Sequence, residues 1–174
     1  MTITVPRAGH AIEDGIGRNS APLLLREVEG DFDVQVRVMG DFSQVDPNKG
    51  EERRAAGLVL TDGTSFVWFG RSEDQDNTLA LTVNAPPMRG VARSSEAKDR
   101  FKPVHIRMER RKKVLTVKFR TNGQDWLRLF DPAKGWEPIV VFLPKKLKVG
   151  VFAESTAPGV FAPGFDHFEL TPAK

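Results

Sequence analysis

Apolar and polar residues alternate along most of the chain, which is the pattern of β-strands with one buried face. In the segment 32–38, Phe32, Val34, Val36 and Val38 fall on one face and polar residues on the other. Helical periodicity is nearly absent, because 12 prolines and 15 glycines leave few windows long enough for a helix. We expect further strands at 22–28, 78–83, 105–109, 114–120, 139–143, 147–154 and 165–171. About ten to twelve short strands predict an all-β protein, a sandwich of two packed antiparallel sheets.

Turn residues separate these strands. Asp62-Gly63 and Asn122-Gly123 tolerate positive φ, which tight hairpins require. Glu29-Gly30-Asp31 indicates another turn. Longer loops are expected at 41–53, 86–100 and 131–138, the second with a short helical turn at 95–98.

The segment 66–69 is apolar on both faces of its predicted strand. Val67 and Phe69 share one face, and Phe66 and Trp68 share the other. Only one face of a sandwich sheet meets the core, so the second pair has two interpretations. Either Phe66 and Trp68 form an exposed platform on which sugar rings stack, or a loop covers them, and burial is the favoured alternative.

Length and charge narrow the function classes. The 174 residues suit one domain, 1–174, and the chain has no cysteine for disulfides or thiol catalysis. Neither a transmembrane run nor a signal peptide is visible, so the expected location is the cytoplasm unless the chain is a fragment of a larger protein. A net charge of +3 is too small to imply a nucleic-acid partner, and no membrane partner is expected.

Several segments resemble an uncharacterised branch of the concanavalin A-like lectin/glucanase superfamily, named after a fungal regulator of enolase. The resemblance rests on Ala21–Leu24, Val28–Phe32, Ala56–Leu58, Pro103–Arg110, Asn122–Trp126, Leu147–Ala153 and Phe165–Leu170. It implies a jelly-roll sandwich whose concave sheet binds glycans in lectin and glycosidase relatives. It implies no activity, and Trp68 departs from the polar or basic residue expected there.

Catalytic and metal motifs are weak. Glu27, Glu29, Asp31 and Asp33 have the alternate spacing that places glycosidase carboxylates on one strand face, but the turn at Gly30 interrupts them. The three histidines lack the spacing of a zinc site, and the acidic loop 73–77 lacks the arrangement of a calcium loop. We expect no metal and no cofactor.

The favoured hypothesis is a non-catalytic binding module, most simply for a carbohydrate, that uses the concave sheet and its rim loops. The alternative is an intracellular protein-interaction or regulatory domain with a protein partner. A glycoside hydrolase or lyase is disfavoured by the missing carboxylate motif. The candidate stacking residues are Phe66, Trp68 and Trp136, and the candidate polar contacts are Gln35, Arg37, Arg71, His105, Arg107 and Lys118.

Overall fold

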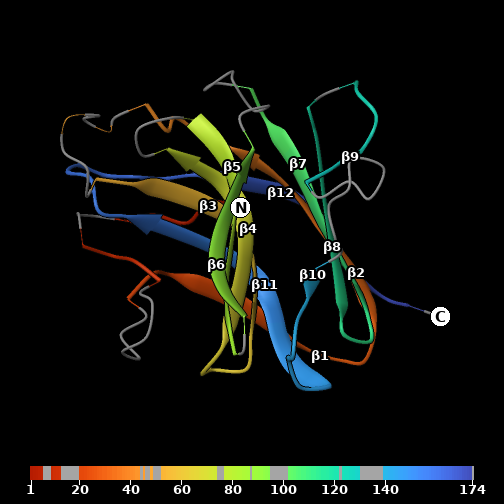
Figure 1. Cartoon of the computed structure of the whole chain (residues 1–174). Helices are drawn as coiled ribbons and strands as arrows, with labels where there is room; N and C mark the ends of the chain where they lie inside the picture. The colour runs from red at the N-terminus through yellow and green to blue at the C-terminus, as the bar shows by residue number, and fades with distance from the viewer. Residues whose placement is uncertain are drawn as a thin grey trace.

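Two antiparallel sheets face each other in a computed structural model of the chain (Figure 1). The structure describes residues 1–5, 9–12, 20–43, 45, 48, 52–73, 77–86, 88–94, 102–121, 123–129 and 139–173. The β4 sheet has the order β1 (Leu23–Glu29), β11 (Lys146–Ser155), β3 (Arg54–Thr61), β4 (Phe66–Glu73), β5 (Asn77–Ala85) and β6 (Met88–Ser94). The β7 sheet has the order β10 (Ile139–Val140), β8 (Val114–Thr121), β7 (Val104–Arg111), β2 (Phe32–Met39) and β12 (Gly164–Pro172), and β9 (Leu127–Arg128) also pairs with β8. The predicted all-β sandwich is confirmed.

The main core lies between the two sheets. Alternation along β2 turns Phe32, Val34, Val36 and Val38 inward, and each is at most 1% exposed. These side chains belong to one apolar cluster with residues of the β4 sheet, such as Phe69. Burial of one such side chain contributes about 1.5–3 kcal/mol to folding, so this layer holds the sheets together.

A second, smaller core lies on the outer face of the β4 sheet. Its centre is Trp68 of β4, whose ring meets the Phe152 ring of β11 at a centroid distance of 5.1 Å. The strand between them, β3, carries Gly57 opposite Phe152. A Cβ on Gly57 would come within 2.3 Å of the Phe69 carbonyl oxygen, so the strands approach too closely there for a side chain. The missing side chain leaves the two rings free to meet above β3.

A segment near the N-terminus covers this second core. Ile12 and Ala21 are buried in it, and Ile12 donates its backbone N–H to Glu154 Oε2 at 2.9 Å. His10 exchanges backbone hydrogen bonds of 2.9 and 3.1 Å with Ser155, which extends the attachment along the end of β11. Trp68 is consequently 2% exposed, so the favoured interpretation of the 66–69 segment, burial under a loop, is the one the structure shows.

The predicted loop at 86–100 is wrong in one respect, because it contains β6. This strand lies at the edge of the β4 sheet, and among the described strands it pairs with β5 alone. It contains Gly90 and lacks regular alternation, since an edge strand with an exposed central Val91 buries little. The helical turn expected at 95–98 lies outside the described residues.

The turn predictions fare better. Gly63 has φ +97° and Gly30 has φ +81°, which confirms the turns that join β3 to β4 and β1 to β2. Asp62 Oδ1 accepts backbone N–H groups from Thr64 and Ser65 at 2.8 and 2.7 Å and fixes the first of these turns. Gly123 also has positive φ, whereas its neighbour Asn122 lies outside the described residues. The described part of the chain contains no helix long and apolar enough to cross a membrane.

Candidate functional site

Polar side chains cover the outer face of the β7 sheet. The alternation that turns Val34 and Val36 inward turns Gln35 outward on β2, and the same parity turns Arg107 outward on β7. Register then aligns these side chains across the strands, with Gln35 opposite both Arg107 and Glu169. The result is an open polar surface built on regular strands.

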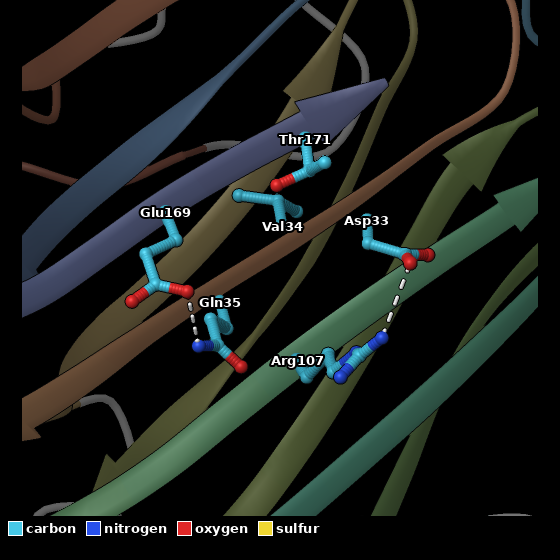
Figure 2. Close-up of a pocket in the computed structure, with 6 residues that line it drawn as sticks. All are labelled: Asp33, Val34, Gln35, Arg107, Glu169 and Thr171. Atoms are coloured by element: carbon cyan, nitrogen blue, oxygen red, sulfur yellow. Dashed lines mark hydrogen bonds and ion pairs between the residues drawn. The ribbon is translucent and has the colours of Figure 1, made fainter. Parts of the chain in front are cut away.

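A shallow pocket of about 150 Å³ is hollowed into this face (Figure 2). Its lining comes from three neighbouring strands: Asp33, Val34, Gln35, Arg107, Glu169 and Thr171. Gln35 Nε2 donates to Glu169 Oε2 at 2.8 Å, and Arg107 Nη2 donates to Asp33 Oδ2 at 3.1 Å. Drug-sized ligands occupy pockets of about 300–1,000 Å³, so this hollow is suited to one small polar group or ring.

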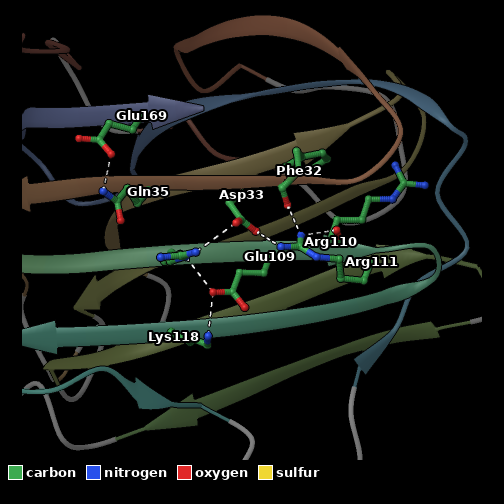
Figure 3. A network of polar contacts seen from close by, with 9 residues as sticks. Phe32, Asp33, Gln35, Glu109, Arg110, Arg111, Lys118 and Glu169 are labelled. Carbon is green, nitrogen blue, oxygen red and sulfur yellow. Dashed lines mark hydrogen bonds and ion pairs between the residues drawn. The ribbon is translucent and has the colours of Figure 1, made fainter. Parts of the chain in front are cut away.

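Ion pairs fix the side chains around the pocket (Figure 3). Arg111 Nη2 lies 2.8 Å from Asp33 Oδ1, so this carboxylate contacts two guanidinium groups. Arg107 Nε and Lys118 Nζ lie 2.8 and 2.7 Å from the same Glu109 oxygen, Oε1. This network holds the donors and acceptors in place, which reduces the entropy lost when a ligand binds.

The carboxylates do not form a glycosidase pair. Both oxygens of Asp33 are occupied by arginines, and Asp31 Oδ1 accepts the Lys112 backbone N–H at 2.6 Å in the turn before β2. Glu27 and Glu29 lie on β1 in the other sheet and pair with Lys146 and Lys145. The predicted turn therefore separates Glu27 and Glu29 from Asp31 and Asp33, so the four carboxylates do not line one face, and Glu27 and Glu29 are each paired with a lysine.

A second ion pair, between Arg37 and Asp166, joins β2 to β12 farther along the face. Arg37 Nε donates to Asp166 Oδ1 at 2.6 Å, and a second guanidinium nitrogen contacts Oδ2. The hydrogen bond from Arg37 lowers the pKa of Asp166, and the positive charge of Arg37 acts in the same direction. The same bond raises the pKa of Arg37.

Two histidines that are distant in sequence meet beside this pair. The rings of His105 on β7 and His167 on β12 have centroids 6.3 Å apart. His167 has φ +51° and lies at the irregularity between Asp166 and Glu169, where the pairing of β12 with β2 shifts. No three acidic or histidine side chains of the described residues gather into a metal site. Residues 74–76 of the acidic loop lie outside the description.

The predicted site residues divide between two sheets. Gln35, Arg37, His105, Arg107 and Lys118 do come together on the outer face of the β7 sheet. Phe66 and Trp68 lie on β4 in the other sheet and are 9% and 2% exposed, so neither offers an open stacking surface. The expectation of one groove with both sets is thus corrected, because strand pairing separates them. Trp136 lies outside the described residues.

Arg71 was expected to contact the ligand, but it is fully buried on the opposite side of β4 from Trp68. Its Nη1 donates to the Lys102 carbonyl at 3.1 Å, and its guanidinium lies 4.7 Å from the centre of the Phe42 ring. Arg54 of β3 lies in the same way against Phe161, at 5.4 Å, and burial lowers its pKa. These arginines close one end of the sandwich core.

Sequence reasoning missed the contribution of β12. Glu169, Thr171 and Asp166 complete the face because β12 pairs with β2. The signal was the alternation at 165–171, which predicts a strand but does not identify its neighbour. A pairing between segments more than 120 residues apart cannot be read from local pattern.

Comparisons with known proteins identify the fold. Neither protein-family models nor curated proteins match the sequence. A functionally unknown protein from Saccharomyces cerevisiae matches with a TM-score of 0.75 at 16% identity, over 99% of this chain and 89% of that chain. The alginate lyase AlgAT5 of polysaccharide lyase family 7 matches with a TM-score of 0.59 at 7% identity, over 99% of this chain and 78% of that chain.

A third match is a xylan β-1,4-xylosidase from Bacillus halodurans C-125, with a TM-score of 0.64 at 14% identity. It covers 98% of this chain and 32% of that chain, so this chain spans about a third of the enzyme. The fold is a concanavalin A-like jelly roll. At these identities the likeness shows the fold alone, because one fold can carry many unrelated functions.

Proposed function

We propose that this protein is a non-catalytic carbohydrate-binding module whose binding surface is the outer face of the β7 sheet. The observation that carries the proposal is the pocket in which carboxylate, amide, guanidinium and hydroxyl groups converge. Sugar hydroxyls both donate and accept hydrogen bonds, and this set of side chains offers partners for both. The surrounding ion pairs hold that set in place before a ligand arrives.

Two further observations support a sugar ligand. The fold neighbours include an alginate lyase and a xylan β-1,4-xylosidase, both named after polysaccharides. The half-exposed Trp126, which follows β8, adds an aromatic ring to the same face, with the Arg120 guanidinium 4.6 Å from its centre. We also propose that the chain belongs to the branch named after the fungal enolase regulator, on the segments quoted above.

A binding role fits these side chains better than hydrolysis. A glycosidase needs one carboxyl that gives up a proton and a second that acts as nucleophile or base. In this pocket Asp33 is held by two arginines, and Glu169 accepts the Gln35 amide. Both carboxylates therefore serve as hydrogen-bond acceptors in a fixed network.

A glycan array followed by calorimetric titration of the best ligand tests the proposal. We expect Gln35→Ala and Glu169→Ala each to weaken binding about tenfold, because each removes a hydrogen-bonding group from the pocket. Glu27→Ala is the matched control, since it removes an exposed carboxylate from the other sheet. The proposal fails if no glycan binds, or if the pocket variants bind as well as the control does.

A further inference from the structure

Positive charge accumulates at one side of the outer face of the β7 sheet. Near the pocket, the two carboxylates of Asp33 and Glu109 face three cations, Arg107, Arg111 and Lys118. Glu169, which accepts from the neutral Gln35 amide, adds a third carboxylate, so charge is balanced around the pocket. The excess of positive charge lies farther along, toward β9, where the face ends.

Two more arginines stand at that end. Arg128 lies directly opposite Lys118 in the pairing of β8 with β9, so their side chains share the outer face. Arg120 lies two residues farther along β8, with its guanidinium 4.6 Å from the centre of the Trp126 ring. Within the described part of the chain, neither arginine forms an ion pair with a carboxylate, and this includes the nearby Asp125. The register thus places Arg128 and the Arg120–Trp126 pair at the same end of the face.

The geometry points to an acidic ligand. We propose that the sugar bound by this face is an acidic oligosaccharide, with a uronate carboxylate between Arg120 and Arg128, an inference that rests on the function proposed above. Guanidinium groups bind carboxylates through paired, charge-assisted hydrogen bonds. Stacking on Trp126 limits the orientations of the Arg120 guanidinium, so less entropy is lost on binding.

The spacing of the strands determines how long the ligand must be. The row Gln35, Arg107, Lys118, Arg128 crosses four neighbouring strands, each in direct register with the next. At roughly 4.8 Å between strands, Arg128 lies about 14 Å from Gln35. A single sugar reaches only one end of this row. An oligosaccharide that runs across the strands contacts the pocket and the arginine pair together.

Oligogalacturonides and their methyl esters provide the sharpest test, because esterification removes the charge and keeps the sugar ring. We expect the wild-type protein to bind the acid at least about tenfold more tightly than the ester in titration calorimetry at low salt. The difference should shrink as salt is raised, because this surface is exposed. Arg120→Ala and Arg128→Ala should each remove most of this difference in affinity between the acid and the ester.

Arg26→Ala is the control, since it deletes an exposed cation from β1 in the other sheet. Equal binding of acid and ester, or an equal loss in the control, would overturn the inference. So would equally tight binding of polyphosphate, a polyanion without sugar. If neutral glycans bind and acidic ones gain nothing, this inference fails and the proposed function stands. If no saccharide of either kind binds, both fail.

Discussion

The two outer faces of this sandwich differ in what lies on them. The outer face of the β4 sheet carries Trp68 and Phe152, and the segment around Ile12 covers it. The outer face of the β7 sheet carries carboxylates, arginines and an amide, and it is open enough to form a pocket. One outer face thus extends the core, whereas the other exposes polar and charged side chains to solvent.

An aromatic residue on the second face of a strand is therefore an ambiguous signal in the sequence of a β-sandwich. In a free sheet, Trp68 would be a natural stacking platform for a sugar. In this protein a short segment, attached through Glu154 and Ser155, makes the same residue part of a second core. The face around the pocket is lined mainly by polar and charged side chains and stays open.

The greatest loss of stability should follow from a substitution on the covered face. Trp68→Ala should lower the free energy of unfolding by about 3–5 kcal/mol, because it leaves a cavity beside Phe152. Trp126→Ala, on the open face, should cost about 1 kcal/mol, since it loses mainly its contact with Arg120. Urea denaturation of both variants measures the contrast. Similar losses of unfolding free energy in the two variants would contradict the distinction between a covered, core-like face and an open one.

A second variant tests how the cover is attached. Glu154→Ala removes the acceptor of the Ile12 N–H and the partner of Arg53, whose Nε lies 2.7 Å from Glu154 Oε1. Glu154 is 1% exposed, so we expect a loss of about 2–3 kcal/mol. Acrylamide should then quench the fluorescence of Trp68 more strongly. Unchanged quenching would show that the cover stays in place without this carboxylate.

The ion pairs of the open face should matter much less for stability. Asp33 and Arg107 have side chains that are 26% and 30% exposed, so the bond between them is partly screened by water. We expect a double-mutant cycle with Asp33→Asn and Arg107→Ala to give a coupling of about 0.5 kcal/mol. A coupling energy several times larger would mean that this ion-pair network stabilises the fold about as much as the second core does.

The smallest effect is pH-dependent and concerns Asp166. Because Arg37 lowers the pKa of Asp166 in the folded state, the pair stabilises the fold above the ordinary aspartate pKa of about 3.9. This contribution is lost as the pH falls below that value toward the folded pKa. Asp166→Asn should therefore be less stable than wild type at pH 6, and the gap should close toward pH 3. A stability difference that does not change with pH would contradict the stabilising role given to the Arg37–Asp166 pair.

Local pattern predicted most of the strands and their faces, because alternation directly reflects which side of each strand is buried, but it missed β6. It placed Gln35, Arg107 and Lys118 outward, as the structure does. It could not predict which strands are neighbours, so it joined Trp68 to a set of residues in the other sheet and omitted Glu169. It also could not predict the cover over Trp68, which depends on the long-range bond from Ile12 to Glu154.

The open face of the β7 sheet, and not the covered face of the β4 sheet, is the proposed binding surface. Amide chemical shifts in a ¹H–¹⁵N spectrum, followed while the best glycan is titrated, test it directly. We predict that the shifts concentrate at Gln35, Arg107 and Glu169, while the amides around Trp68 stay in place. Shifts centred on Trp68 and Phe152, with the β7 sheet unmoved, would contradict it.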